Sequence, residues 1–596
     1  MVEDNKNHLN EFSQMMGRVE CNLITLSIFM NTIKDNLNIK KNGATFTPVL
    51  LADFLAEKIL KYNTKDSVRV LDPSCGDGAL LLSIGKELVS KKITFELRGV
   101  DINYNYLRKA ETRLESHFGE SRYLVQYADF LESISFDDTR FGTSNGISMD
   151  MNQCADIIIA NPPYVRTQLL GAAYAQRISK KYGLKGKVDL YFPFVKAMTF
   201  ALKEGGILGV ITSNKYLNTK SGESIREFLR ENYEILEIID LGDTKLFDAA
   251  VLPAIFIGRK TRTDSTESCQ FFKIYQDFNK KTRLEGKKMS IYEALKNNYV
   301  GNFKHNENSY VCTSGAVKFD SSNKSNWILL DLREEEFVRK IEAACFSRVR
   351  DHFKVKIGVK TTADKVFIRK DWGAYDIIEP EAELMYDLIS QENIKAWGTP
   401  ETDLRILYPH FDNKGKCNRI NLEDYPRTKE YLLSNFEVLN NRHYVLKSGR
   451  GWYEIWVPQN PALWKLPKVV FPDISIEPRF CFDSSGKLVN GNCYWMAATN
   501  EKDLDILLFI QGVCNSRLMN YYHSLMYNNK LYAGRKRYFS QYIENYPLPR
   551  FSSANFQAVV ALVKQLNNTE TLDKSDLENK LNKLINEAYG LCRDFF

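Results

Sequence analysis

A short apolar strand that runs into two prolines is the feature that most constrains this chain. Residues 156–164 are Asp-Ile-Ile-Ile-Ala-Asn-Pro-Pro-Tyr. A β-branched apolar run of this kind predicts a strand of a parallel sheet that is buried on both faces. Proline fixes φ and has no N–H group, so the strand has to end at Asn161. Ligands of open α/β sheets bind at the carboxyl ends of strands, which places Asn161 and Tyr164 at a ligand crevice.

The functional groups at this turn suit a planar base that carries an amino group. The Asn161 side-chain oxygen and the Pro162 carbonyl can each accept one N–H of an –NH2 group, while Tyr164 stacks on the ring. Accepting both hydrogens draws the nitrogen lone pair out of conjugation and makes the amine nucleophilic. The alternative is a turn that merely ends a strand, because paired prolines are common in turns.

A second set of ligand-binding residues lies upstream. The glycine-rich turn Asp72-Pro73-Ser74-Cys75-Gly76-Asp77-Gly78 follows a predicted strand and opens a helix. Its glycines let the backbone approach a ligand closely, as the first loop of a nucleoside site requires. The next two strands lead to Asp101, which suits ribose hydroxyls, and to Asp129, which can accept from an adenine amine while Phe130 covers the ring. Together, at strand ends, these residues favour a nucleoside pocket.

Strands and helices alternate up to about residue 260. Thr47-Pro48 is expected to start a helix, with Thr47 as its N-cap and Pro48 at the first helical position. A helix is also predicted from residue 189 to its end at Gly205-Gly206, and residues 275–330 are expected to be irregular. The predicted strands of the sheet are 68–71, 95–100, 123–127, 157–160, 207–212, 235–241 and 252–257.

Length and composition favour several domains. The chain has 596 residues, which exceeds one hydrophobic core. Residues 442–550 hold 14 Lys and Arg against 8 Asp and Glu, so one domain is expected to face a polyanion. The 11 cysteines show no metal-type spacing, so no metal site is predicted and the thiols are expected to be free. No signal peptide or membrane-spanning segment is visible, and a cytoplasmic protein is expected.

The order of these motifs resembles the DNA adenine-N6 methyltransferases of the gamma class, typified by the TaqI enzyme. That family has a T-P helix, D-P-x-x-G-x-G, an acidic residue after the second strand, D-F after the third and N-P-P-Y after the fourth. A target-recognition domain follows. The resemblance implies an α/β Rossmann-like S-adenosylmethionine-dependent methyltransferase domain, followed by a mixed α+β DNA target-recognition domain. The predicted divisions are a helical segment 1–44, the methyltransferase domain 45–265, a connecting region 266–345, the target-recognition domain 346–550 and a helical tail 551–596.

The resemblance also implies a role for each site residue. Asn161, Pro162 and Tyr164 would hold the target adenine, with Phe247 as the second stacking wall. Direct methyl transfer to the amine requires no metal and no covalent enzyme intermediate. The residues expected to bind S-adenosylmethionine are Thr47, Asp72, Ser74, Cys75 and Gly76 at its methionine end, Asp101 and Ile102 at its ribose, Asp129 and Phe130 at its adenine, and Pro163.

The implied partner is double-stranded DNA, from which the target adenine has to be flipped. Arg535, Lys536 and Arg537 are expected to contact phosphates. The chain would be the modification component of a restriction-modification system, with a separate cognate endonuclease, or a solitary methyltransferase associated with a bacterial or archaeal nucleoid. No nuclease activity is expected, and a monomer is compatible with the sequence. The alternatives are methylation of RNA, of a release-factor glutamine or of a cytosine amine, and a non-catalytic DNA-binding subunit.

Overall fold

The computed structural model describes most of the chain beyond residue 45. The described residues are 46–134, 152–165, 171–184, 189–246, 251–261, 267–278, 286–319, 325–374, 377–527, 534–550, 553–569 and 573–592. The helical segment predicted for residues 1–44 and the predicted stacking residue Phe247 lie outside them.

The chain divides into two compact units. Unit 1 comprises Met1–Phe272, Met289–Tyr299 and Lys318–Ser325, and unit 2 comprises Lys273–Lys288, Val300–Val317 and Asn326–Phe596. The predicted methyltransferase domain falls in unit 1, whereas the predicted target-recognition domain and tail fall in unit 2. The predicted connecting region 266–345 is divided between both units, and the domain limits given above stay a prediction.

Unit 1 is built on a twisted sheet with the strand order β3-β2-β1-β4-β5-β7-β6, and β8 follows β6. The strands from β3 to β5 are parallel, whereas β7 is antiparallel to both β5 and β6. All six residues of β4 are buried, as its β-branched run predicts. The strands are β1 (Ser67–Asp72), β2 (Thr94–Asp101), β3 (Tyr123–Tyr127), β4 (Ala155–Ala160), β5 (Leu202–Ser213), β6 (Tyr233–Asp240), β7 (Pro253–Lys260) and β8 (Ser268–Asp277).

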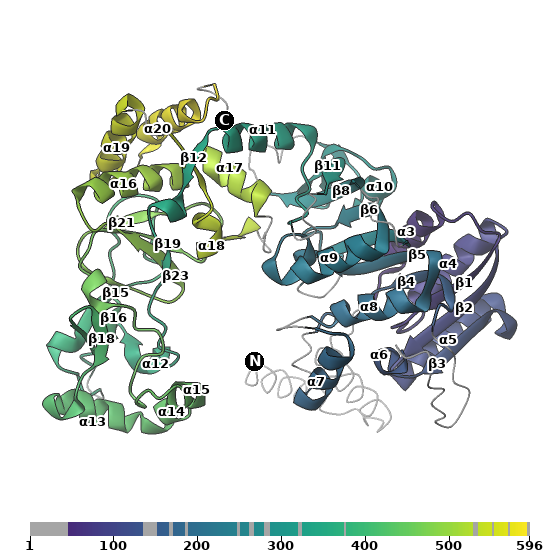
Figure 1. Ribbon diagram of the computed structural model, residues 1–596, viewed down its shortest axis with the longest axis horizontal. Coiled ribbons are helices and arrows are strands. Elements are labelled where there is room, and N and C mark those ends of the chain that lie inside the picture. Colours follow the sequence, from purple (N-terminus) through teal and green to yellow (C-terminus); the bar gives the residue numbers. More distant parts are fainter. Residues whose placement is uncertain are drawn as a thin grey trace, which may run out of the picture. The chain divides into compact units, whose positions relative to one another are not determined.

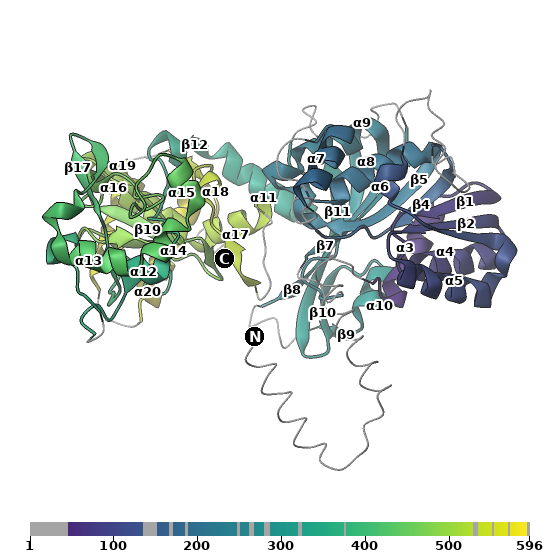
Figure 2. The same cartoon turned by 90° about the horizontal axis from the view of Figure 1, so that it is seen from below.

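Helices cover both faces of this sheet. Figure 2 shows α3, α4 and α5 on one face, and α8 and α9 on the other. This arrangement gives the three layers of a Rossmann-like fold and confirms the predicted fold class. The helices of unit 1 are α3 (Val49–Leu60), α4 (Ala79–Ser90), α5 (Tyr104–Phe118), α6 (Phe130–Ser133), α7 (Ala172–Lys181), α8 (Tyr191–Ala201), α9 (Glu223–Asn232) and α10 (Ile291–Lys296).

Two local predictions in unit 1 are wrong. Gly205-Gly206 does not end a helix, because α8 ends at Ala201 and both glycines lie within β5. Thr47 is not the N-cap of α3: Pro48 holds that position, without a side-chain cap bond. The Pro48 carbonyl accepts from Leu51 N and Ala52 N at 3.0 Å, so the first turn starts one residue later than predicted.

The prediction of an irregular stretch at residues 275–330 is also wrong. In unit 2 the hairpin of β10 (Gly301–His305) and β11 (Asn308–Lys318) pairs antiparallel, and β9 (Lys287–Lys288) joins β10 in parallel. Phe303 and Tyr310 face each other across this hairpin, and their rings stack at 5.5 Å. Alternation of buried and exposed residues in β11 is weak, which hides the strand from periodicity.

The rest of unit 2 contains two hydrophobic cores. One joins the four-stranded sheet β13-β23-β19-β21 to α16, α17, α19 and α20, and the other lies around the sheet β14-β16-β15-β22. Figure 1 shows the C-terminal helices at one end of this unit and α13, α14 and α15 at the other.

Unit 2 is therefore mixed α+β, as predicted, and residues 553–568 and 575–588 of the predicted tail form helices. Its helices are α11 (Leu332–Ala343), α12 (Asp364–Phe367), α13 (Pro426–Ser434), α14 (Phe436–Asn440), α15 (His443–Lys447), α16 (Glu501–Asn515), α17 (Arg517–Met526), α18 (Ser540–Ile543), α19 (Ser553–Asn568) and α20 (Ser575–Ala588). Its further strands are β12 (Cys345–Arg348), β13 (Lys356–Ile357), β14 (Ile368–Arg369), β15 (Met385–Ile389), β16 (Arg405–Leu407), β17 (His410–Asn413), β18 (Lys416–Arg419), β19 (Lys468–Pro472), β20 (Ile474–Ser475), β21 (Cys481–Asp483), β22 (Leu488–Val489), β23 (Cys493–Ala497), β24 (Lys536–Arg537) and β25 (Pro547–Pro549).

Candidate functional site

The strand register brings the predicted motifs to one edge of the sheet in unit 1. Asp72 at the end of β1 pairs with Gly99 of β2, and Asp101 at the end of β2 pairs with Tyr127 of β3. On its other side β1 pairs in parallel with β4. The glycine-rich turn, the two acidic positions and the Asn161 corner therefore follow the carboxyl ends of adjacent strands, where ligands of α/β sheets bind.

The glycine-rich turn is built around two carboxylates. Asp72 is 1% exposed and accepts a bond of 3.1 Å from Ser74 N, and burial raises its pKa well above the usual value. Asp101 accepts from Gly76 N at 2.9 Å and from Asn103 N at 2.8 Å, and burial raises its pKa as well. Two buried carboxylates held by backbone N–H groups leave room for a cationic or hydroxyl-bearing ligand.

Three other residues of the turn have the properties of pocket walls. Gly78 has φ +78°, and a Cβ there would lie 3.0 Å from the Cβ of Ala110, so the helix after the turn requires glycine. Burial raises the pKa of the Cys75 thiol well above its usual value, which keeps it protonated and a poor nucleophile. Ser74 Oγ is buried and has no hydrogen-bond partner among the described residues. An orphaned buried hydroxyl of this kind fits a polar ligand group.

The predicted adenine-binding pair is only partly accessible. Asp129 caps α6 through bonds from Leu131 N and Glu132 N, and its Oδ2 accepts from the Tyr174 hydroxyl at 2.9 Å. Phe130 is 1% exposed, and its ring stacks on that of Phe194 at 6.0 Å. By contrast, Ile102, which was expected at the ribose, is exposed.

Sequence reasoning did not find the helix that holds this acidic segment. Lys181 Nζ of α7 donates to the carbonyls of Leu131 and Glu132, and the Tyr182 hydroxyl donates to the Leu131 carbonyl. Arg177 forms an ion pair with Glu132. With the bond from Tyr174, these contacts fasten the helix after the N-P-P-Y motif to the segment that carries Asp129. A basic, aromatic face of α7 was the only sequence signal for it.

The Asn161 corner contacts the T-P segment. Asn161 Nδ2 donates to Thr47 Oγ1 at 3.0 Å, which joins residues 114 positions apart, and both residues are buried. The Thr47 hydroxyl therefore orients the Asn161 amide, in place of the capping role that was predicted. Because the amide nitrogen faces Thr47, the side-chain oxygen points elsewhere.

The remaining residues of the corner form a stiff apolar wall. Pro162 is buried, and Pro163 is half-buried. The Tyr164 hydroxyl is buried without a hydrogen-bond partner among the described residues, and burial raises its pKa. Tyr164 therefore keeps a neutral ring, as a stacking residue needs.

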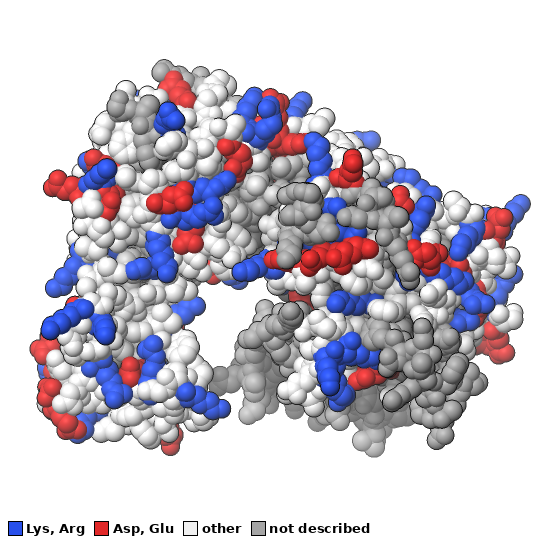
Figure 3. Space-filling view, viewed as in Figure 1, with Lys and Arg blue, Asp and Glu red and all other residues white. Residues whose placement is uncertain are grey.

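The three residues of unit 2 that were predicted to contact phosphates differ in exposure and in their partners. Figure 3 shows basic and acidic side chains interspersed over the face in view, so charge density alone does not single out a DNA-binding surface there. Arg535 is exposed. Lys536 instead donates to Asn520, and Arg537 forms an ion pair of 3.0 Å with Asp473.

In the part of the chain that the structure describes, no three His, Cys, Asp or Glu side chains gather in an arrangement that could hold a metal ion. Within that part, every helix is too short or too polar to cross a bilayer.

Fold and site together define an S-adenosylmethionine-dependent methyltransferase with a Rossmann-like core. Residues 79–247 match the family model described as Eco57I restriction-modification methylase. The type II methyltransferase M.BanIII of Aneurinibacillus aneurinilyticus is 40% identical over 572 residues, covering 93% of this chain and 98% of that protein. M.PaeR7I of Pseudomonas aeruginosa is 25% identical over 579 residues, with 93% of each chain covered. The chain belongs to the type II DNA methyltransferases of restriction-modification systems.

Solved structures agree on the fold. The type IIL restriction-modification enzyme MmeI in complex with DNA matches with a TM-score of 0.55 and 13% identity, over 96% of this chain and 75% of MmeI. The DrdV–DNA complex matches with a TM-score of 0.53 and 12% identity, over 90% of this chain and 58% of DrdV. The alternative interpretations, an RNA or release-factor methyltransferase and a non-catalytic subunit, are not favoured by the membership in the type II DNA methyltransferases that the likeness to M.BanIII shows.

Proposed function

We propose that this methyltransferase acts on the exocyclic N6 amine of adenine, in a base flipped out of double-stranded DNA. The observation that carries the proposal is the Asn161-Pro162-Pro163-Tyr164 corner at the carboxyl end of β4, beside the glycine-rich turn after β1. Its groups match an amine on a planar ring, and the resemblance to the gamma class points to adenine rather than cytosine.

The residues of the glycine-rich turn fit S-adenosylmethionine, which supplies a sulfonium methyl group when bound. Asp72 would face the cationic amino group, since an opposite charge offsets the burial that raises its pKa. The buried Ser74 hydroxyl would meet a polar group of the methionine moiety. Asp101 would accept from the ribose hydroxyls and Asp129 from the adenine amine, through lone pairs left beside their present bonds.

In the proposed reaction the chain holds and activates the target amine. The Asn161 oxygen and the Pro162 carbonyl would accept its two hydrogens, which leaves the nitrogen lone pair free to act as the nucleophile. Tyr164 stacks on the flipped base and offsets part of the flipping cost of a few kcal/mol. Thr47 holds the Asn161 amide in the orientation that presents its oxygen. Preorganised acceptors of this kind favour the transition state over the ground state.

The roles of Phe247, Pro163 and the basic residues of unit 2 stay predictions. Phe247 would form the second stacking wall, and Pro163 would line the cofactor pocket. Arg535 is exposed and suits a phosphate contact, whereas Lys536 and Arg537 support it from bonds inside unit 2. A separate cognate endonuclease is proposed as the partner in the cell.

Nucleoside analysis tests the proposal. The protein is incubated with S-adenosylmethionine and genomic DNA, and the DNA is hydrolysed and analysed by mass spectrometry. We expect N6-methyldeoxyadenosine as the product. N4-methyldeoxycytidine, or the absence of any methylated nucleoside from the DNA, would overturn the assignment.

A further inference from the structure

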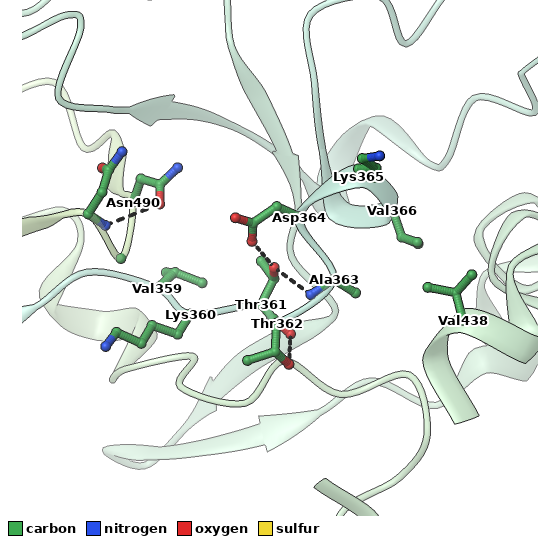
Figure 4. Close-up of a pocket in the computed structure, with 12 residues that line it drawn as sticks. Val359, Lys360, Thr361, Thr362, Ala363, Asp364, Lys365, Val366, Val438 and Asn490 are labelled. Atoms are coloured by element: carbon green, nitrogen blue, oxygen red, sulfur yellow. Dashed lines mark hydrogen bonds between the residues drawn. The ribbon is translucent and has the colours of Figure 1, made fainter. Parts of the chain in front are cut away.

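A hollow in unit 2 has no part in the site described above. Its volume is about 630 Å³, and its walls come from residues 359–366, from Val438 of α14 and from Asn490–Asn492. Figure 4 shows the turn of residues 361–364 at its centre, with Asn490 on one side and Val438 on the other. More of the surface exposed inside the hollow is apolar than polar, and its charged side chains are those of Lys360, Asp364 and Lys365.

The central turn is rigid because it is braced from inside the fold. The Thr361 carbonyl accepts from Arg442 Nη1 at 2.9 Å, and both residues are buried. The Thr361 hydroxyl donates to the Asp364 carboxylate, and its oxygen accepts from Ala363 N at 3.1 Å. The carbonyl and the hydroxyl of Thr361 are thus both hydrogen-bonded, and these bonds hold the neighbouring residues of the turn in place.

Thr362 carries backbone strain at the surface of this turn. Its φ is +61°, in the left-handed region that a β-branched residue rarely adopts, and it is exposed. A threonine in this conformation costs about 1–3 kcal/mol, and such residues cluster at ligand sites. Glycine would adopt the conformation without that cost.

The opposite wall approaches the turn closely. A Cβ on Gly491 would lie 2.7 Å from Lys360 Cγ and 2.7 Å from the Val359 carbonyl oxygen. Val359 N also donates to the Val489 carbonyl at 2.7 Å. This packing leaves the Lys360 stem against the Asn490 loop and directs its charged end outward.

Two lysines supply the positive charge of the hollow. Lys360 precedes the turn and Lys365 follows it, and both are exposed. Among the described residues neither lysine lies within ion-pair distance of a carboxylate, although Lys360 acts on Asp473: burial raises the pKa of that carboxyl group, and the charge of Lys360 lowers it. The Asp364 carboxylate accepts from the Thr361 hydroxyl. In Figure 4 the two lysine side chains point to opposite sides of the turn, with Asp364 between them.

We propose that this hollow holds the sugar-phosphate backbone of DNA. Lys360 and Lys365 contact separate phosphates of one strand, and the Thr362 side chain packs against the backbone between them. The proposal rests on DNA as the substrate of this methyltransferase and adds a backbone contact that is distinct from Arg535. Lysine acts on phosphate as a point charge, so the site positions the duplex without reading its sequence.

The test is a pair of charge-matched double variants of the full chain. Lys360→Ala/Lys365→Ala removes the two proposed contacts, and Lys502→Ala/Lys580→Ala removes two exposed lysines of α16 and α20. Fluorescence anisotropy measures the Kd for a duplex that carries the methylated sequence, mapped beforehand, and for a scrambled duplex, between 50 and 200 mM salt. We expect the first variant to raise the Kd for both duplexes about tenfold and to reduce the slope of log K against log salt concentration by about 1.8. The control variant should change Kd less than about twofold.

Each other outcome overturns the proposal. Equal weakening by both double variants would mean a general charge effect, and weakening of the specific duplex alone would mean base reading. Deoxyadenosine monophosphate is added as a competitor: Lys360-dependent binding of this nucleotide alone would make the hollow a small-molecule site. Unchanged S-adenosylmethionine binding and melting temperature show that the variant is folded. The Kd measurements do not depend on which base is methylated. A failure of this proposal can therefore be told apart from a failure of the adenine assignment.

Thr362→Gly separates strain from function. We expect the melting temperature to rise by a few degrees, because glycine relieves the φ of +61°, while DNA affinity falls about threefold. A rise in stability with unchanged affinity would exclude Thr362 from the site.

Discussion

The two units differ in how their buried charged groups are paired. In unit 1 the buried carboxylates Asp72 and Asp101 are held by backbone N–H groups at the ends of adjacent strands, and burial raises both pKa values. In unit 2 the buried Lys468 of β19 pairs across the sheet with Asp483 of β21, with Nζ and Oδ2 2.7 Å apart and both side chains 0% exposed. The first arrangement leaves charge to be met by a ligand, and the second neutralises it within the fold.

The comparison shows which kind of buried charge indicates a functional site. A buried ion pair within a sheet is a stability feature, and removing one partner is costly because the other charge stays buried. A buried carboxylate with backbone partners at a strand end is a ligand site. Five variants sharpen this contrast, and the first has the largest expected effect.

Asn161→Ala in unit 1 removes the acceptor for the target amine. We expect methyl transfer to fall by about a thousandfold or more, while the Kd for S-adenosylmethionine stays within about tenfold, because the amide acts mainly in the transition state. Filter-binding transfer assays and calorimetry measure the two quantities. Asn232→Ala, on α9, is the matched control and should keep the parental rate. A parental rate in Asn161→Ala would contradict the assigned role.

Lys468→Met in unit 2 leaves Asp483 buried without its counter-ion. We expect the free energy of unfolding of unit 2 to fall by about 3–5 kcal/mol, measured by urea denaturation. The exposed pair of Lys564 and Asp505 provides the control, since Lys564→Met should cost less than about 1 kcal/mol. Equal effects of the two substitutions would remove the distinction between the pairs.

Tyr174→Phe tests whether α7 positions Asp129 for the cofactor. The variant keeps the ring and loses the bond to Asp129 Oδ2, so we expect the KM for S-adenosylmethionine to rise about threefold to tenfold with little change in kcat. Tyr182→Phe removes a hydroxyl bond to the same segment without touching the carboxylate, and should change KM less than about twofold. A loss of kcat alone, or equal effects of both variants, would make Tyr174 a packing residue.

Arg535→Ala is expected to weaken binding of all DNA sequences about threefold and to lower the salt slope by about 0.9. Arg537→Ala breaks the ion pair with Asp473 and should lower stability more than the salt slope. Binding isotherms at several salt concentrations distinguish the two arginines. Loss of sequence discrimination in Arg535→Ala would make it a base reader instead.

The last variant concerns Asp156 of unit 1, a buried carboxylate that pairs with two partly exposed lysines. Burial pushes the pKa of Asp156 up, but bonds from Lys203 and Lys65 outweigh it and lower the pKa to about 2. A folded pKa below the unfolded value of about 3.9 stabilises the protein above pH 4, and this contribution is lost as pH falls through 4 and through the folded pKa to about pH 1. We expect Asp156→Asn to cost about 1 kcal/mol at pH 7 and nothing near pH 1. A cost that does not change with pH would exclude the charge as its source.

The sequence predicted unit 1 far better than unit 2. Every strand from β1 to β7 was expected, because each of them contains a short run of apolar residues and most of these runs end in a polar or glycine residue. The bond between Thr47 and Asn161 could not be predicted, since it depends on a side-chain direction across 114 positions. The contact of Tyr174 with Asp129 was missed for the same reason.

In unit 2 the strands are short, and buried and exposed residues do not alternate along many of them. Periodicity therefore gave no register for β19 or β23, and the hairpin of β10 and β11 was taken as irregular. The hollow at Lys360 joins three distant stretches of the chain, and the φ of Thr362 follows from its packing. Neither property has a local sequence signal.

The position of β7 has a consequence for synthesis of the protein on the ribosome. β7 lies between β5 and β6, yet both of these strands precede it in the chain. A nascent chain that has not yet reached Pro253 therefore carries two strand edges that wait for the same absent neighbour, and such edges recruit other chains. Slow translation or premature termination before residue 260 would expose the molecule to aggregation, although Asn161 and the whole glycine-rich turn had already been made.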